Sequence, residues 1–328
     1  MGTALVTGAS GFVGSAVARA CLERGRKVRL LLRKTSPRKN VEALGVEIVE
    51  GDVRDKASVR RAMAGVDEVF HVAALFKYVW RPAQDFYDVN VGGTSNVIEA
   101  AREAGVRRIV HTSTIGAVGA RTDGIAVDET VAWNFGGFGE HYTESKRQAE
   151  VLALEHARAG APVVVVNPSG PVGPRDITPT PAGRTIVELL KGRIPMYPKA
   201  TMSFVDVDDL ATGHVLAAET GRVGERYLLA GHNVTVKDYL DIIARAGGRK
   251  PPRFAIPDFV VPIVSGLEEL RARTFGGDAL ASSAIARMRG FTLWYDASKA
   301  RGELGWSCRP LEESVRRAID WFRSEGYL

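Results

Sequence analysis

The sequence predicts an α/β protein built on a doubly wound parallel sheet, with a smaller C-terminal lobe. Its expected strands are nearly continuous apolar runs and alternate with helix-like segments, which is typical of a parallel sheet covered on both faces. A glycine-rich turn joins the first strand to the first helix, and beyond Pro168 the alternation gives way to proline-rich turns. We therefore expect a first domain at residues 1–168 and a smaller lobe at 169–328, some segments of which return to the main sheet.

The elements can be placed in order along the chain. The expected strands are residues 4–6, 28–32, 46–49, 69–72, 108–111 and 163–166. The first helix follows the glycine-rich turn, and later helices are expected near residues 56–64, 83–104, 141–159, 184–190, 208–218, 236–246 and 310–325. Gly25, Gly65 and Gly105 each follow a helix-like segment and are expected to end it, because glycine is favoured just past a helix. In such a fold, ligands gather at the carboxyl ends of the strands.

Composition and charge are those of an ordinary globular protein with an ample core. The chain has 328 residues, of which 45% are hydrophobic and 25% are charged. Its net charge is +6, but the basic residues are dispersed, without the aromatic-interleaved stripe or zinc spacing typical of nucleic-acid-binding proteins. We therefore expect no nucleic-acid partner, and phosphate-bearing small molecules account for the basic character.

The cysteines and the apolar segments indicate the cell compartment of the protein and whether it spans a membrane. Cys21 and Cys308 lie far apart and match no metal or redox spacing, so we expect a reducing, cytoplasmic compartment, no metal ion, and a core position for Cys21. The N-terminus shows no secretory signal. The most apolar segment, residues 254–267, is short and interrupted by Pro257 and Pro262, so it cannot span a bilayer. We expect it to be a buried loop of the C-terminal lobe rather than a membrane contact.

The glycine-rich turn reads Thr7-Gly8-Ala9-Ser10-Gly11-Phe12-Val13-Gly14. In this pattern Gly8 allows the tight turn, Gly11 lets the backbone approach a pyrophosphate, and Gly14 lets helix and strand pack closely. The phosphates would then lie at the helix N-terminus, where unpaired N–H groups and the helix dipole favour an anion. The turn lacks the Gly-Lys-Ser/Thr ending of an ATPase phosphate loop. It therefore predicts a dinucleotide site.

A second motif, Tyr142-Thr143-Glu144-Ser145-Lys146, lies on the helix that follows the fifth strand. Residues four apart on a helix share a face, so Tyr142 and Lys146 point the same way. A nearby ammonium favours phenolate and so makes a tyrosine usable as an acid or base for a hydroxyl or carbonyl. Lys146 can also hydrogen-bond a nicotinamide ribose.

Hydroxyl side chains end the fifth strand, as Thr112-Ser113-Thr114. A hydroxyl there can hold a substrate oxygen beside Tyr142, although such clusters also form loops without any ligand. The pattern alone does not decide whether Ser113 or Thr114 takes this role.

Together these motifs resemble those of the extended short-chain dehydrogenases/reductases. The glycine pattern of that family stands at Thr7 to Gly14, and its Ser/Thr–Tyr–Lys set at Thr114, Tyr142 and Lys146, with Thr114 placed by its spacing to Gly119. The resemblance further covers Asp52, Ala73, Ala74, Asn90, Asn167-Pro168-Ser169, Gly173-Pro174 and residues 204–210, which is nearly the whole chain. Within the family, the chain is most similar to the hopanoid-associated sugar epimerases and the dihydroflavonol reductase-like group.

The resemblance implies a Rossmann fold, a C-terminal lobe that binds substrate, and hydride transfer at a carbinol or ketone carbon. It places Asp52 near the adenine, Ala73 and Ala74 along the dinucleotide cleft, and Pro168 to Gly170 near the nicotinamide. The residues expected to bind the cofactor are Gly8, Ser10, Gly11, Phe12, Val13, Gly14, Arg33, Asp52, Val53, Ala73, Ala74, Thr112, Tyr142, Lys146, Pro168, Ser169 and Gly170.

The end of the second strand departs from the NAD-binding pattern. Where those relatives place an aspartate for the ribose hydroxyls, this chain has Leu32, followed by Arg33 and Lys34. A guanidinium binds phosphate through paired, charge-assisted hydrogen bonds, so Arg33 favours the 2′-phosphate of NADP, with NAD as the alternative.

Three functions are compatible with these residues. The first is an NADP(H)-dependent oxidoreductase acting on a ketone, aldehyde or secondary alcohol, and the second is a nucleotide-sugar epimerase that keeps its cofactor. The third is a non-catalytic dinucleotide sensor, which has no need of the acid–base pair Tyr142 and Lys146. The sequence does not name the substrate, and it leaves a homodimer open.

Overall fold

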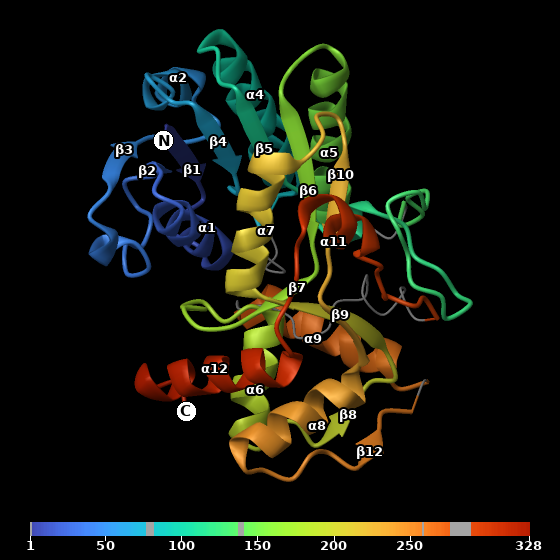
Figure 1. Cartoon of the computed structure of the whole chain (residues 1–328). Coiled ribbons are helices and arrows are strands. Elements are labelled where there is room, and N and C mark those ends of the chain that lie inside the picture. The colour runs from blue at the N-terminus through green and yellow to red at the C-terminus, as the bar shows by residue number, and fades with distance from the viewer. Residues whose placement is uncertain (1, 77–81, 137–140, 258, 276–289) are drawn as a thin grey trace.

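A seven-stranded parallel sheet forms the centre of the computed structural model (Figure 1). The structure describes residues 2–76, 82–136, 141–257, 259–275 and 290–328. The strands are β1 (Thr3–Thr7), β2 (Lys27–Leu32), β3 (Glu47–Glu50), β4 (Glu68–His71), β5 (Arg108–Thr112), β6 (Val163–Pro168) and β10 (Arg226–Leu229). Their spatial order is β10-β6-β5-β4-β1-β2-β3, so the chain reverses direction beside β1, as in a doubly wound fold. The predicted fold class is confirmed.

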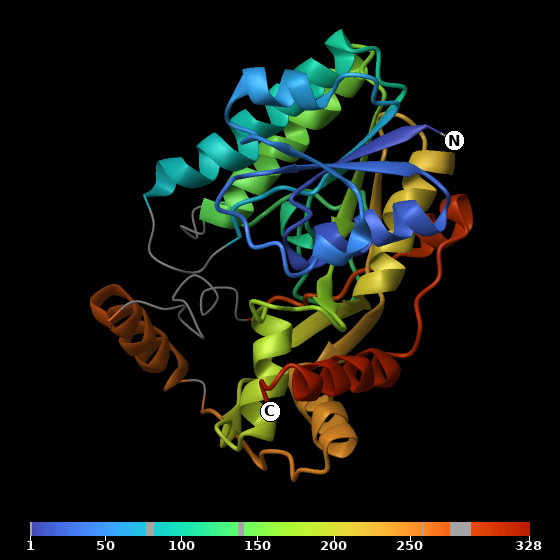
Figure 2. The same cartoon turned by 90° about the vertical axis from the view of Figure 1, so that its left-hand side faces the viewer.

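Helices cover both faces of this sheet (Figure 2). One face packs against α1 (Phe12–Glu23) and α7 (Val207–Thr220). The other packs against α2 (Lys56–Ala62), α4 (Gly93–Glu103) and α5 (His141–Arg158). Burial from both sides is the reason the strands are mainly apolar. The glycines Gly25, Gly65 and Gly105, predicted to end helices, all have positive φ just past α1, α2 and α4.

The helix expected at residues 83–104 is not uniform. It consists of α3 (Ala83–Tyr87), a π-helical turn at Asp88–Gly92, and α4. Such π turns often occur at functional sites.

Three helices and a small sheet make a second layer below the carboxyl ends of the main strands. The helices are α6 (Pro181–Leu190), α8 (Val236–Gly247) and α12 (Leu311–Ser324), and they share a separate core with the sheet β11-β9-β7. The strands of this sheet are β7 (Gly170–Val172), β9 (Thr201–Asp206) and β11 (His232–Thr235), and a pair of short strands, β8 (Met196–Tyr197) and β12 (Phe254–Ala255), lies at its outer end. Between these elements the chain returns to the main sheet, where β10 extends it beside β6 and α11 (Ser298–Leu304) packs against β10 and α7.

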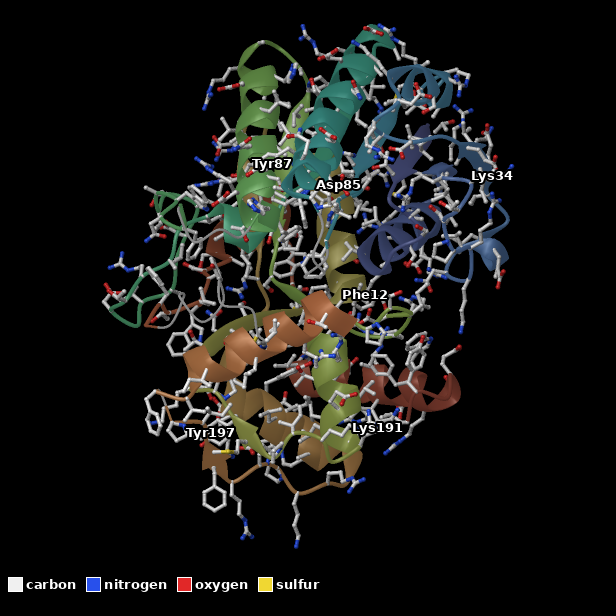
Figure 3. All side chains as sticks on the ribbon, turned by 180° about the vertical axis from the view of Figure 1, so that it is seen from behind. Phe12, Lys34, Asp85, Tyr87, Lys191 and Tyr197 are labelled. Atoms are coloured by element: carbon white, nitrogen blue, oxygen red, sulfur yellow. The ribbon has the colours of Figure 1, made fainter. Side chains whose placement is uncertain are left out.

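The apolar segment 254–267 is not the buried loop expected from the sequence. Residues from Val261 to Phe275 form α9. Phe259, just before this helix, and Ile263, within it, are 77% and 60% exposed. Pro262 does not break this helix because it lies in the first turn, where a missing N–H costs no hydrogen bond. In the view of Figure 3, α9 is seen between Phe12 and the residues Lys191 and Tyr197, and Figure 2 shows that it lies at one side of the molecule. No helix in the described ranges is both long and apolar enough to cross a membrane.

Candidate active site

The glycine-rich turn links β1 to α1, and each of its glycines has a distinct geometric reason. Gly8 has φ +73°, and a Cβ there would lie 2.6 Å from the backbone N of Ala73. A Cβ on Gly14 would lie 2.3 Å from the carbonyl O of Gly8, so this position requires close packing. A Cβ on Gly11 would meet nothing nearer than that same oxygen, at 3.4 Å. The structure thus leaves room on the outer side of Gly11.

The start of α1 is suited to an anion. Gly11 is the N-cap residue and has no side chain to accept from the first-turn amides. The N–H groups of this turn, including those of Phe12 and Val13, have no acceptor within the helix by geometry, and the helix dipole adds positive potential. A pyrophosphate fits this donor set.

A chain of hydrogen bonds holds the end of β4 beside the glycine-rich turn. The amide of Ala73 donates to Thr7 Oγ1 (3.1 Å), and Thr94 Oγ1 donates to the carbonyl of Asn90 (2.6 Å). Since the Thr94 proton is used, His71 Nε2 must donate to Thr94 (3.1 Å), and Thr7 donates to His71 Nδ1 (2.8 Å). Burial lowers the pKa of His71 to about 3, which keeps it in this neutral tautomer.

Asn90 lies in the π-helical turn and connects two parts of the site. Its Oδ1 accepts from the amide of Leu75 (2.7 Å), and its Nδ2 donates to Ser145 Oγ (2.9 Å). The loop after β4 is thereby tied to α5. This position was carried from the family resemblance, and the structure gives it a physical function.

Tyr142 and Lys146 lie one turn apart on α5. Lys146 is 2% exposed, and its Nζ donates to the carbonyl O of Thr112 at the end of β5 (2.6 Å). Burial lowers the pKa of Lys146 to about 8, against the opposing effect of the Glu150 carboxylate. The ring of Tyr142 is partly exposed and packs edge-on against Phe76, with centroids 4.8 Å apart.

The three hydroxyls at the end of β5 have different partners. Ser113 Oγ is buried and donates to Glu150 (2.5 Å). Thr112 Oγ1 donates to His214 Nε2 (3.0 Å), because Nδ1 of that ring donates to a helix carbonyl. Thr114 Oγ1 accepts from the amide of Gly116 (3.2 Å), which leaves its proton for another acceptor. Of Ser113 and Thr114, the two candidates for holding the substrate oxygen, the geometry favours Thr114.

The residues expected at the adenosine end lie after β2 and β3. Arg33 is exposed. Asp52 accepts from Arg54 through both carboxylate oxygens (2.8 and 3.1 Å), and this pairing lowers the pKa of Asp52, with the charge of Arg33 adding to it. The carbonyl of Val53 accepts from Asn96 Nδ2 (2.9 Å). The adenine contact expected of Asp52 stays a prediction.

The segment after β6 holds a buried hydroxyl without a partner. Ser169 is 3% exposed, and its Oγ has no hydrogen bond within the described part of the chain. Its amide donates to the carbonyl of Leu229 on β10 (3.2 Å), and a Cβ on Gly170 would meet Phe204 at 3.1 Å. A buried hydroxyl of this kind is suited to a ligand group, because leaving it unpaired is costly.

Sequence analysis did not single out Glu150, which is fully buried and holds Ser113. Glu150 follows Lys146 by four residues, which places both on one helix face, and this spacing could have identified Glu150 from the sequence. Among the described residues, no three His, Cys, Asp or Glu side chains are grouped as metal ligands would be.

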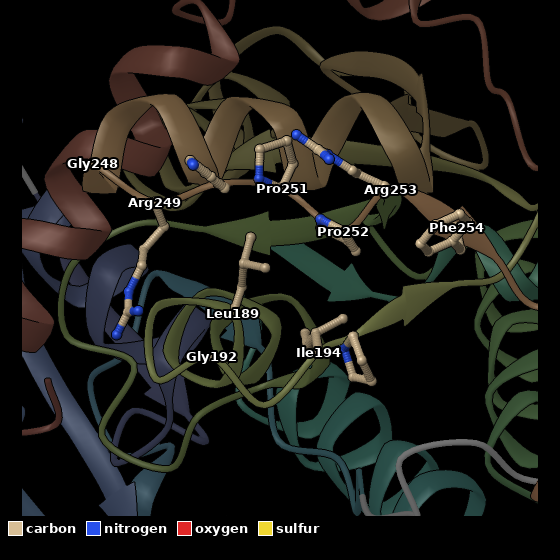
Figure 4. A pocket seen from close by; sticks show the side chains of 11 residues that line it. Leu189, Gly192, Ile194, Gly248, Arg249, Pro251, Pro252, Arg253 and Phe254 are labelled. Carbon is tan, nitrogen blue, oxygen red and sulfur yellow. The ribbon is translucent and has the colours of Figure 1, made fainter.

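A cavity of about 530 Å³ opens in the second layer, between the ends of α6 and α8 (Figure 4). It is lined by none of the predicted site residues. Its cations Arg249, Lys250 and Arg253 follow the C-terminus of α8, where the helix dipole favours positive charge without any ligand. We assign no function to this cavity.

Known proteins are similar to this chain in sequence and in fold. The chain is 34% identical over 327 residues to a putative dihydroflavonol 4-reductase of Synechocystis, covering 98% of this chain and 95% of that protein. It is 34% identical over 330 residues to sterol demethylase protein B of Methylococcus capsulatus, covering 99% and 100%. The crystal structure of a nucleoside-diphosphate-sugar epimerase from Pseudomonas aeruginosa has a TM-score of 0.83 at 29% identity and 99% coverage of both chains.

These relatives include reductases and epimerases, and the family comprises enzymes that use NAD or NADP. Residues 4–230 match the NAD dependent epimerase/dehydratase family. This stretch spans the main sheet from β1 to β10 and both predicted motifs. The chain therefore belongs to the NAD dependent epimerase/dehydratase family and is an enzyme of that family.

Proposed function

We propose that this protein is an NADP(H)-dependent oxidoreductase that transfers hydride at a ketone, an aldehyde or a secondary alcohol. The observation that carries the proposal is the placement of Tyr142 and Lys146 on α5, with Lys146 buried and bonded to the end of β5. The side chain of Thr114 follows directly beyond that strand. These three groups are an acid–base side chain, a cation and a hydroxyl at the edge where parallel sheets bind ligands.

Each residue has a role in the proposed reaction. A bound nicotinamide supplies or accepts the hydride. Thr114 holds the substrate oxygen, and Tyr142 exchanges a proton with that oxygen, donating in reduction and accepting in oxidation. The Lys146 ammonium favours the phenolate form of Tyr142 and contacts the nicotinamide ribose. The apolar ring of Phe76 beside Tyr142 helps to exclude water.

Three features support binding of NADP. The open side of Gly11 and the uncapped start of α1 suit the pyrophosphate. Arg33 stands directly after β2, where a carboxylate would repel a 2′-phosphate, and its exposed guanidinium is free to pair with that group. Ser169 offers a buried hydroxyl after β6, near the expected nicotinamide position.

The test asks whether the purified protein retains a nucleotide and whether it oxidises NADPH. Purified protein is denatured, the released nucleotide is identified by its absorbance and mass, and NADPH oxidation is then followed with a panel of ketones and aldehydes. An empty site together with NADPH-dependent turnover supports the proposal. Failure of every carbonyl substrate, with a site empty of nucleotide, contradicts it.

A nucleotide-sugar epimerase is the second candidate. It is favoured by the likeness to the Pseudomonas aeruginosa epimerase, which spans nearly the whole of both chains. Such an enzyme needs to retain its nucleotide between the two hydride transfers. Stoichiometric NAD(H) in the denatured protein would therefore favour this candidate over the reductase.

A further inference from the structure

A buried carboxylate lies behind the proposed active site. Glu150, on α5, is completely buried, and its Oε2 accepts from Ser113 Oγ (2.5 Å) and Asn167 Nδ2 (2.6 Å). Its Oε1 pairs with Arg226 on β10 (2.8 Å) and more weakly with Arg147 (3.4 Å). Four donors, from the end of β5 and from β6, β10 and α5, therefore meet on one carboxylate.

These contacts fix the end of β5 residue by residue. Lys146 Nζ holds the carbonyl of Thr112 (2.6 Å), and Glu150 holds the hydroxyl of Ser113. Asn167 Nδ2 is shared between Glu150 and the carbonyl of Thr114 (3.0 Å), so the carboxylate also orients the amide that holds Thr114. The position of the Thr114 hydroxyl thus depends on Glu150.

Stability alone does not explain this arrangement. Burying a charged pair costs several kcal/mol in desolvation, and well-packed apolar residues often serve as well or better. The carboxylate is, however, one helical turn from Lys146, whose charged form is itself penalised by burial. A negative charge at this place favours the ammonium.

The other titratable groups facing Lys146 cannot supply that charge. His71 on β4 and His111 on β5 are buried, and burial lowers the pKa of both imidazoles, which are therefore neutral. Were they protonated, they would oppose the ammonium. Glu150 is the group that acts in its favour.

We propose that Glu150 is a positioning residue of the reaction, which fixes residues 112–114 beside Tyr142 and supplies the negative charge that keeps Lys146 protonated. The proposal rests on the function inferred for Tyr142 and Lys146. It assigns Glu150 no contact with substrate or cofactor.

The decisive variant is Glu150→Gln. The single oxygen of a glutamine amide is needed by Arg226, since an NH2 group cannot accept from a guanidinium, and the NH2 then lies opposite Asn167 Nδ2. Asn167 can meet that donor by turning toward it its own Oδ1, which has no partner among the described residues. The carbonyl of Thr114 then loses its donor. Loss of the charge also lets Lys146 lose its proton at lower pH.

The primary measurement is the dissociation constant of NADPH, from its fluorescence, between about pH 7 and 10. For the parent protein, affinity should weaken as pH rises past about 8, as Lys146 deprotonates. For Glu150→Gln, the midpoint should move down by about one pH unit. Glu150→Asp keeps the charge and should leave the midpoint in place, as should Glu155→Gln, a control at an exposed position of the same helix.

Lys146→Met tests whether Lys146 is the titrating group, because it should abolish the alkaline change. If Glu150→Gln does not fold, Arg226→Gln serves instead, since removing the opposing cation should move the midpoint upward. An unchanged midpoint in Glu150→Gln would overturn the proposal. If the midpoint of Glu150→Gln is unchanged but Tyr142→Phe loses turnover, the role of Glu150 is rejected and the proposed function stands. If the midpoint of Glu150→Gln shifts but Tyr142→Phe keeps normal turnover, the proposed function is rejected and the role of Glu150 stands.

Discussion

Replacing His111 with leucine should stabilise the protein, and more so in acid. His111 is completely buried on β5, and neither ring nitrogen has a hydrogen-bond partner within the described residues. An unsatisfied buried polar group costs about 1–3 kcal/mol, and leucine has a similar volume with no polar atom. We therefore expect His111→Leu to raise the free energy of unfolding at pH 7 by about 1–3 kcal/mol.

The pH dependence follows from proton binding. Burial lowers the pKa of His111 well below 6.5, so below that pH the unfolded chain binds a proton that the folded protein does not. Each pH unit below the unfolded pKa then costs about 1.4 kcal/mol of stability, or about 2 kcal/mol at pH 5. Leucine removes this loss, so the advantage of His111→Leu should be about 2 kcal/mol larger at pH 5 than at pH 7.

Urea unfolding at both pH values measures this difference, and His71→Leu provides the matched comparison. His71 is equally buried, but both of its nitrogens are hydrogen-bonded, so its replacement should destabilise the protein at pH 7 while giving the same relative gain in acid. An advantage for His111→Leu that is equal at the two pH values would refute the argument from the buried neutral ring.

Four further substitutions test the proposed site. Arg33→Asp should shift preference from NADP(H) toward NAD(H), because a carboxylate repels the 2′-phosphate and accepts from ribose hydroxyls, and unchanged dissociation constants for both cofactors would contradict this. Gly11→Val should abolish cofactor binding in calorimetric titrations yet leave a folded protein. Gly14→Ala should by contrast impair folding, because its Cβ would lie 2.3 Å from a backbone oxygen. Tyr142→Phe should keep cofactor affinity while turnover falls about 10²–10⁴-fold, and near-normal turnover would move the proton transfer elsewhere and revive the sensor hypothesis.

Much of the main sheet could be predicted from the sequence, because a strand buried on both faces is a nearly continuous apolar run. The runs at 28–32 and 163–166 fall within β2 and β6 on that ground alone. The π-helical turn at Asp88–Gly92 left no such pattern, and the contacts of its Asn90 with Leu75 and Ser145 join residues far apart in the sequence. The exposure of α9 also escaped prediction, since apolar composition does not say which surface, if any, covers a helix.

The three hydroxyls at the end of β5 likewise could not be told apart from the sequence. Ser113 and Thr114 are chemically alike in sequence, and only the positions of distant residues separate them. Ser113 is hydrogen-bonded to Glu150, which is 37 residues away in the sequence, and Thr112 to His214, which is 102 residues away. Single-sequence reasoning identified the cluster, but it had no access to these partners.

The geometry of a doubly wound sheet explains why the candidate residues are where they are. Side chains within a strand alternate between faces, and both faces here are covered, so Thr112 and Ser113 are bound by the helices on opposite sides. The first two positions beyond a strand lie at the carboxyl edge of the sheet, where such folds bind ligands. Gly8, Arg33, Asp52, Ala73, Thr114 and Ser169 occupy such positions after β1, β2, β3, β4, β5 and β6. Tyr142 and Lys146 instead lie on a helix, where the four-residue spacing places a phenol and an ammonium on one face.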